Sequence, residues 1–294
     1  MLNTSIITIG DELLIGQVID TNSAWIAQQL NKAGIRVNRR VAVGDIWDDI
    51  WQALDEESVH ADIILITGGL GPTADDITKP LLCKYFNGNL VVDNDVLENV
   101  KYLFEKVFKR EVTERNFKQA EVPDVCKVIS NKRGTAPGMW FEKDGKIFVS
   151  MPGVPHEMKG MMETDVIPLL IKRFEVSHIA HRTLLTFGIG ESMLADLIQD
   201  FEESLPVYIR LAYLPNYGMV RLRLTAVSED KSKVEKELDE LFIQLQQLVK
   251  ENLVTNEDEK MEEVVGKILL QKNKKMCTAE SCTGGYIAHL MTSI

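Results

Sequence analysis

The sequence is poor in the residues that mark metal-binding or disulfide-stabilised folds. Its 294 residues include only 4 cysteines and 5 histidines. The cysteines form no C-x-x-C pair, and the histidines show neither H-x-x-x-H nor H-E-x-x-H spacing, so the common zinc motifs are absent. No apolar run approaches the ~20 residues that span a bilayer, and the N-terminus has no basic, cleavable leader. We therefore expect a cytoplasmic protein with free thiols and no membrane partner.

Positive charge is scarce as well. Lysine and arginine number 33 against 44 aspartates and glutamates, and the formal net charge is −11. Nucleic-acid binders need a basic face, so we expect no nucleic-acid partner. The G-x-x-x-x-G-K-[ST] motif of P-loop proteins is missing, and so is the glutamate-rich helix of Nudix hydrolases. Chemistry on a phosphate would need a different scaffold.

What the sequence does contain is an alternation of strands and helices. Apolar runs at 5–10, 35–44 and 61–67 predict strands, and the 3.6-residue periodicities that follow predict helices at 20–34, 46–58 and 75–87. Asp20, Thr21 or Asn22 can cap the first helix, and Asp45 the second. This order predicts a parallel α/β sheet, which binds ligands beyond the carboxyl ends of its strands. The loops after the first and third strands therefore share one edge.

The rest of the chain divides into further segments. Residues 99–123 predict a charged peripheral helix, Asp144-Gly145 a hairpin turn, and Pro155 a helix start. From residue 174 the pattern becomes β-α-β-β-α, which is a small α+β unit. After a polar stretch at 256–260, we expect a helix, a strand, an SCTGG loop and another helix. The predicted domains are thus 1–173, 174–255 and 256–294.

The stretch TGGLGPTADDIT, residues 67–78, carries the strongest chemical signal. Its glycines let backbone amides approach a ligand, its threonines add hydroxyl groups, and the helix that follows adds a positive dipole end, which together suit a pyrophosphate. Asp75 and Asp76 would repel that group unless a divalent cation lay between them. Asp11 and Glu12, in GDELL, form a second acidic pair at the same edge. One of these four carboxylates could instead be a general base.

Each motif also has another interpretation. Asp75 or Asp76 could simply cap a helix, and Asp11 could brace its loop. GLGPTA with Asp93 about 20 residues later imitates a dinucleotide-binding fingerprint, but the two adjacent carboxylates and the third-strand position disfavour it. In MPGVPHEM, Gly153 and Glu157 could contact a ligand, or the segment could be an ordinary loop that starts a helix.

In their order and spacing, GDELLIGQVIDTN, TGGLGPTADDIT, RGTAPGMW and MPGVPHEM resemble the CinA family (competence/damage-inducible protein A). The resemblance implies a three-layer MoaB/MogA-like (molybdopterin-binding-like) domain with a mostly parallel sheet, followed by a small KH-like domain. The latter lacks a G-x-x-G clamp between helices, so we expect no RNA binding. TAESCTGG resembles the start of the family's nicotinamide-nucleotide amidase domain. The sequence stops soon after Ser281, so we expect no deamidase activity.

The resemblance also implies an activity, namely metal-dependent hydrolysis of ADP-ribose to AMP and ribose 5-phosphate. We predict Asp75, Asp76 and Asp11 as catalytic residues and as ligands of a divalent metal (Mg²⁺, Mn²⁺ or Co²⁺). The ligand-binding residues predicted beside them are Glu12, Asp20, Asn22, Thr67, Gly68, Gly69, Gly71, Pro72, Thr73, Thr78, Gly153 and Glu157.

Two other functions are open at this point. The protein could bind a pterin or nucleotide without catalysis, or transfer an adenylyl group in molybdopterin metabolism. It could also be a scaffold with a vestigial site. We expect a homodimer, because two-fold dimers are the commonest assemblies of soluble proteins.

Overall fold

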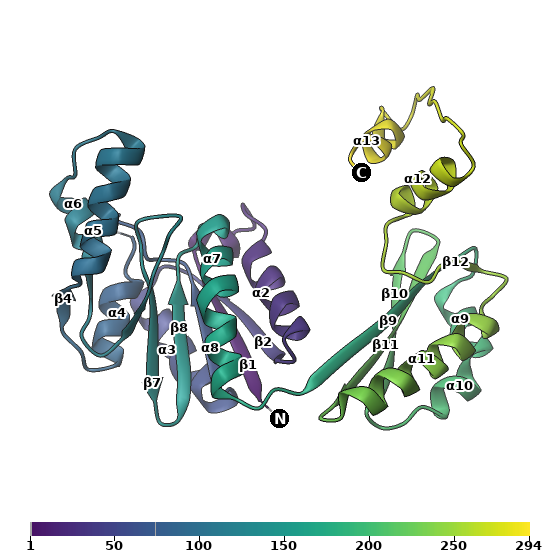
Figure 1. The fold of residues 1–294 in the computed structure, drawn as a ribbon, viewed down its shortest axis with the longest axis horizontal. Helices are drawn as coiled ribbons and strands as arrows, with labels where there is room; N and C mark the ends of the chain where they lie inside the picture. Colours follow the sequence, from purple (N-terminus) through teal and green to yellow (C-terminus); the bar gives the residue numbers. More distant parts are fainter. Residues whose placement is uncertain (1, 74) are drawn as a thin grey trace. The chain divides into compact units, whose positions relative to one another are not determined.

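Short apolar strands alternate with amphipathic helices in the first part of the chain. In the computed structural model, which describes residues 2–73 and 75–294, the chain divides between Ser177 and His178 into two compact units. The first unit contains a six-stranded sheet in the order β2-β1-β3-β8-β7-β6 (Figure 1). Its strands are β1 (Asn3–Ile9), β2 (Arg36–Val43), β3 (Ile63–Thr67), β6 (Lys127–Ile129), β7 (Gly138–Lys143) and β8 (Lys146–Met151).

The sheet is mostly parallel, as predicted. Strands β2, β1, β3 and β8 run in one direction, whereas β7 is antiparallel to both β8 and β6. The β7–β8 turn is the predicted Asp144-Gly145 hairpin. Both residues have positive φ, of 52° and 77°, which the two-residue type I′ turn requires.

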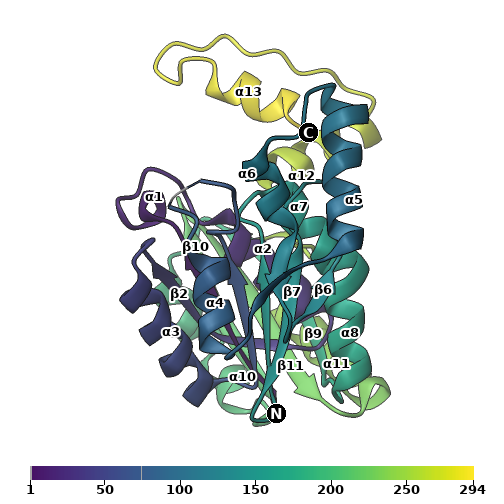
Figure 2. The same ribbon diagram turned by 90° about the vertical axis from the view of Figure 1, so that its left-hand side faces the viewer.

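Helices cover both faces of this sheet, so the predicted three-layer α/β fold is confirmed. The helices on one face are α2 (Thr21–Lys32), α7 (Pro155–Met161) and α8 (Ile167–Arg173), and those on the other are α3 (Trp47–His60) and α4 (Thr78–Tyr85) (Figure 2). Successive strand side chains point to opposite faces. Ile6 therefore packs in the same core as Ile26 of α2, while Ile7 packs in the core that contains Leu54 of α3.

Two shorter segments complete the first unit. One turn of helix, α1 (Asp11–Leu14), follows β1. The predicted charged segment is helical but interrupted, and it lies beside a two-stranded sheet. Its parts are β4 (Leu90–Val92), α5 (Asn94–Tyr102), a π-helical turn (Leu103–Phe108), α6 (Glu114–Phe117), a 3₁₀ turn (Lys118–Ala120) and β5 (Glu121–Pro123).

The second unit begins with the predicted β-α-β-β-α pattern, so its small α+β fold is confirmed. Its antiparallel sheet has the order β10-β11-β9-β12. The elements are β9 (His178–Phe187), α9 (Glu191–Leu197), α10 (Gln199–Glu203), β10 (Ile209–Asn216), β11 (Met219–Ser228), α11 (Lys231–Leu248) and β12 (Leu253–Thr255). Leu184 and Leu222 from the sheet and Leu238 from α11 are fully buried in one core.

The last residues form two helices, α12 (Met261–Gln271) and α13 (Tyr286–Thr292). The strand expected between them is wrong. Residues 274–280 adopt no regular structure and nearly all are exposed, because a strand needs a neighbouring strand to pair its backbone groups. The predicted third domain, 256–294, lies inside the second unit. Across the described residues, no helix combines the length and apolar character needed to cross a membrane.

Candidate functional site

Three neighbouring parallel strands end at the same edge of the six-stranded sheet. Thr8 of β1 lies beside Thr67 of β3, and Thr67 lies beside Met151 of β8. The loops that follow these strands contain the GDELL, TGGLGPT and MPGVP sequences. The predicted meeting of the first two loops at one edge is confirmed, and the third loop joins them.

Gly68 shows how closely these loops approach one another. Its φ is +118°, and a Cβ atom there would lie 2.2 Å from the carbonyl oxygen of Ile9. Its amide donates a hydrogen bond to the carbonyl of Met151 at 3.1 Å. A Cβ atom on Gly153 would in turn lie 3.4 Å from the Cα of Gly68. Only glycine at position 68 lets three loops share this small space.

The loops enclose a cleft of about 370 Å³, which falls within the ~300–1,000 Å³ range of small-molecule sites. Many of the predicted residues line it, namely Glu12, Gly68, Gly69, Gly71, Pro72, Asp75, Asp76, Gly153 and Glu157. A smaller hollow beside it shares Glu12 and Gly153 with the cleft, and it is lined by three further predicted residues, Asp20, Asn22 and Thr67.

Three predicted residues lie outside the walls of both hollows. The amide of Thr78 donates to the carbonyl of Gly69 at 3.2 Å, and its fully buried hydroxyl lies directly behind that glycine. Thr73 donates its hydroxyl to Asp76. Asp11 turns toward the loop that follows β2. These residues shape the loops without facing the ligand space.

Asp76 organises the glycine loop from within. Its carboxylate accepts the backbone amides of Gly71 at 2.7 Å and Thr73 at 2.9 Å, in addition to the Thr73 hydroxyl. The interpretation of Asp75 or Asp76 as a helix cap is wrong, because α4 begins at Thr78 and its N-cap position is Ile77. The carboxylate thus occupies amides that were expected to contact a phosphate, and it holds the loop in shape by itself.

Asp11 and Asp45 tie the loop after β1 to the loop after β2. The amide of Asp11 donates to Oδ2 of Asp45, and the amide of Asp45 donates to Oδ1 of Asp11, both at 3.1 Å. The expectation that Asp45 caps helix α3 is wrong, since the N-cap position is Ile46 without a side-chain bond. Asp45 instead lines the cleft. The sequence did not indicate this role for Asp45, because an aspartate before a helix has the same pattern whether it caps the helix or lines a cleft.

The cleft carboxylates repel one another. Burial raises the pKa of Asp45, and the neighbouring charges of Asp11, Glu12 and Asp75 raise it further. A hydrogen bond from Thr73 lowers the pKa of Asp75, which is fully exposed. The lining includes Glu12, Asp45, Asp75, Asp76 and Glu157, and it contains no lysine or arginine among the residues described.

This oxygen-rich lining suits a hard divalent cation. Over residues 2–73 and 75–294, no three acidic, histidine or cysteine side chains converge as a ready-made metal site, and the predicted trio of Asp11, Asp75 and Asp76 is not assembled. Mg²⁺-type ions commonly use one or two carboxylates and complete their shell with water and substrate phosphates. The carboxylates present fit a cation of that kind, and its charge would relieve their mutual repulsion.

Glu157 is a half-buried acid of the cleft. It lies in the first turn of α7, and its Oε2 accepts a hydrogen bond of 2.6 Å from the side-chain amide of Asn131. Burial raises the pKa of Glu157, an effect that the hydrogen bond from Asn131 opposes. Buried carboxyl groups with raised pKa values are suited to proton transfer near neutral pH.

The side hollow has a different character. Nδ2 of Asn22 donates to the carbonyl of Gly153 at 2.7 Å and to the hydroxyl of Thr67 at 3.4 Å. As predicted, Asp20 caps α2, accepting from the amide of Ser23 at 2.9 Å. Leu13, Val18 and Ile19 supply apolar surface.

Gln119, Thr135 and Ala136 also line the cleft, although only the RGTAPGMW motif pointed to the latter two. The half-buried Lys79 donates to the carbonyl of Gln119 at 3.0 Å, and desolvation lowers the pKa of Lys79 to about 8. Asp93, the acid of the dinucleotide-binding alternative, is absent from the cleft walls and caps α5 instead.

The fold and the site define a class of protein, a two-unit α/β protein with an acidic ligand cleft at the carboxyl edge of a mostly parallel sheet. Residues 5–172 match the family described as "Probable molybdopterin binding domain". Residues 181–255 match the KH domain of damage-inducible protein CinA, and residues 258–294 match the CinA C-terminal domain.

The chain belongs to the CinA family. It is 47% identical over 294 residues to a CinA-like protein of Flavobacterium psychrophilum, covering 100% of this chain and 70% of the relative. It is 45% identical to a CinA-like protein of Cytophaga hutchinsonii, covering 98% of this chain and 69% of the relative. These relatives are therefore longer than the chain described here.

Solved structures also match. A CinA protein of unknown function from Thermoplasma acidophilum is 35% identical with a TM-score of 0.49, and the match covers 55% of this chain and 94% of that one. The molybdopterin biosynthesis enzyme MoaB from Thermus thermophilus is 18% identical with a TM-score of 0.40, covering 59% and 94% of the two chains.

Proposed function

We propose that the first unit hydrolyses the pyrophosphate of ADP-ribose, or of a related nucleotide diphosphate, to AMP and ribose 5-phosphate. The observation that carries this proposal is the cleft itself, where the carboxylates of Glu12, Asp45 and Asp75 line one space beside a glycine loop. An acidic cleft without lysine or arginine would repel a pyrophosphate unless a cation accompanied it.

A divalent cation would be held by Asp75 with Glu12 or Asp45, while Asp76 keeps the glycine loop in shape. Such an ion, when bound, neutralises the charge of the pyrophosphate and polarises it for attack. This assignment replaces Asp11 by Asp45 among the predicted ligands, because Asp45 lines the cleft and Asp11 does not.

In the reaction, the oxygen of a water molecule bonds to one phosphorus, and the anhydride P–O bond on the other side of that phosphorus breaks. Glu157 takes the proton of the attacking water, and the departing phosphate carries away the electron pair of the broken bond. Asn131 orients Glu157 through the 2.6 Å hydrogen bond.

A second candidate function is binding of a molybdopterin or nucleotide, with or without adenylyl transfer. The match of residues 5–172 to the molybdopterin-binding domain family favours it. The two functions differ in one measurable outcome, because only the first releases AMP from ADP-ribose.

The test is AMP release from ADP-ribose by the purified chain with Mg²⁺, Mn²⁺ or Co²⁺, and with a chelator. The variant Asp75→Asn/Asp76→Asn should lose at least 100-fold in rate. The control is Asp144→Asn in the β7–β8 turn, where asparagine tolerates the φ of 52°; it should keep full activity. If no metal gives turnover while ADP-ribose or a pterin still binds, the hydrolase proposal is wrong and the binding function stands.

A further inference from the structure

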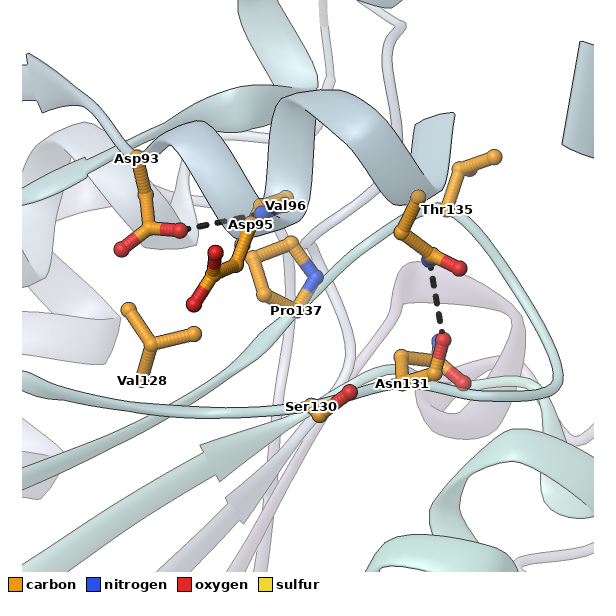
Figure 3. A pocket seen from close by; sticks show the side chains of 9 residues that line it. Asp93, Asp95, Val96, Val128, Ser130, Asn131, Thr135 and Pro137 are labelled. Carbon is orange, nitrogen blue, oxygen red and sulfur yellow. Dashed lines mark hydrogen bonds between the residues drawn. The ribbon is translucent and has the colours of Figure 1, made fainter. Parts of the chain in front are cut away.

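A second cavity, of about 180 Å³, adjoins the cleft at Thr135, which lines both. Figure 3 shows its lining, which comes from two segments. Asp93 caps α5, and Asp95, Val96 and Asn99 belong to it; the other lining residues are Val128 of β6 and, after that strand, Ser130, Asn131, Thr135 and Pro137. Among these residues, Asp93 was considered only in the dinucleotide-binding alternative and Thr135 only as part of the RGTAPGMW motif.

The polar groups of this cavity are a mixed set. Asp93 uses Oδ1 to accept the amide of Val96 at 3.0 Å, which fixes its carboxylate at the start of the helix. Asp95 is exposed in the first turn of α5. Ser130 and Thr135 bring hydroxyl groups. Hydrogen-bond acceptors with full charge thus lie next to groups that can both donate and accept.

The remaining walls are apolar, formed by Val96, Val128 and Pro137. Two carboxylates would repel a phosphate by about 1–4 kcal/mol per close charge pair. Apolar walls would in turn leave a bare cation without enough oxygen ligands. A neutral sugar fits both conditions, because adjacent hydroxyls donate to carboxylates and its C–H groups pack on apolar side chains. Carboxylates recognise ribose hydroxyls in this way in dinucleotide-binding folds.

One loop contributes residues to the walls of both the cavity and the cleft. Thr135 lines both the cavity and the cleft. Nδ2 of Asn99 donates to the backbone carbonyls of Asn131 at 3.0 Å and Gly134 at 3.2 Å, and Nδ2 of Asn131 donates to Glu157 in the cleft. The loop is therefore held in place from the α5 side, and Thr135 marks the point where the two hollows adjoin.

We propose that this cavity is the subsite for the sugar that lies beyond the pyrophosphate, with Asp95 and Asp93 accepting hydrogen bonds from its neighbouring hydroxyls. The inference rests on the proposed function, because it takes the pyrophosphate of the same molecule to occupy the cleft. It assigns substrate selection to α5, a helix outside the glycine loop.

The test compares ADP-ribose with the methyl ester of ADP, which keeps the adenosine and the pyrophosphate but lacks the terminal sugar. Dissociation constants are measured by calorimetry with the divalent metal present, in the Glu157→Gln background, which should bind both compounds but hydrolyse them at least 100-fold more slowly; kcat/KM is measured with Glu157 in place. The full chain should bind ADP-ribose at least 10-fold more tightly than the methyl ester. Asp95→Asn should lose most of that ratio by weakening only the binding of ADP-ribose. Glu98→Gln, an exposed change on the same helix but outside the cavity lining, should preserve the ratio.

Equal affinities for the two compounds, or a ratio that Asp95→Asn leaves unchanged, would overturn the subsite even if AMP is released. If neither compound is hydrolysed with any metal, the proposed hydrolysis fails, yet the ratio of dissociation constants still decides the subsite. Failure of both compounds to bind overturns it as well.

Discussion

The cleft of the first unit and the β9–α11 surface of the second unit arrange their charged side chains in opposite ways. In the second unit, Arg182 forms ion pairs of 2.7 Å with both Glu235 and Asp239, and the hydrogen bond from Arg182 helps to lower the pKa of Glu235. In the cleft of the first unit, acids neighbour other acids, and the pKa of Asp45 is raised. Paired charges support a fold, whereas like charges gathered in one hollow oppose it and are typical of a functional site.

The largest effect is expected at Glu157. Glu157→Gln keeps the shape but cannot accept a proton, so kcat should fall by about 100-fold or more. Because burial raises the pKa of Glu157, the activity of the parent protein should rise with pH through a limb above the usual range of a glutamate. Asn131→Ala removes the hydrogen bond that lowers this pKa, so the limb should move to higher pH. A pH profile of kcat/KM measures both effects.

An unchanged limb in Asn131→Ala would show that another group takes the proton. Glu163→Gln on the same helical segment is the control, since Glu163 is absent from the cleft lining, and its profile should match that of the parent.

The second comparison is between a glycine with no room for a side chain, Gly68, and a glycine with free space around it, Gly188. Gly68→Ala brings a Cβ atom against the Ile9 carbonyl at positive φ, and it should destabilise the first unit by about 3 kcal/mol or more. Gly188 in the second unit also has a positive φ, but a Cβ atom there would have open space around it. Gly188→Ala should therefore destabilise the second unit by only about 1 kcal/mol. Urea denaturation measures both values. Equal losses would show that the three loops do not meet as closely as described.

The smallest effect tests the charge contrast directly. The raised pKa of Asp45 means that its ionisation opposes folding, and this cost appears as the pH rises through that pKa. Asp45→Asn, which can still accept the amide of Asp11, should therefore raise the Tm by about 1–3 °C at neutral pH. The increase in Tm should vanish at a pH low enough to protonate Asp45. It should also become smaller when Mn²⁺ is added.

Arg182→Met is the counterpart in the second unit. It removes two partly exposed ion pairs and should lower stability by about 1 kcal/mol, independently of Mn²⁺. Melting curves of the full chain measure both variants. A lower Tm for Asp45→Asn would mean that this acid stabilises the fold, and the contrast between the units would fail.

The sequence predicted the fold through local patterns with simple physical causes. Alternating strands and helices, the Asp144-Gly145 turn and the proline that starts α7 depend on neighbouring residues alone. The strand expected between the last two helices was wrong, because strand formation depends on a partner strand. Patterns within one segment cannot show whether that partner exists.

The site was predictable only in part, for a related reason. Strand ends and glycine spacing placed Asp75, Glu12 and Gly153 at one edge correctly. The direction in which an acid points depends on its hydrogen bonds. Asp11 turned to Asp45, and Asp76 turned into its own loop. The spacing of residues in the sequence predicts neither of these side-chain orientations. It does not predict the cavity beside α5 either.

The carboxylate of Asp76 has a consequence for selectivity. An anion that reaches the glycine loop finds the amides of Gly71 and Thr73 already engaged. Free phosphate should therefore bind weakly at this loop and compete poorly with the substrate, even at concentrations common in cells. A ligand that binds together with a cation does not depend on these amides. The loop therefore selects cation-bound ligands over free anions.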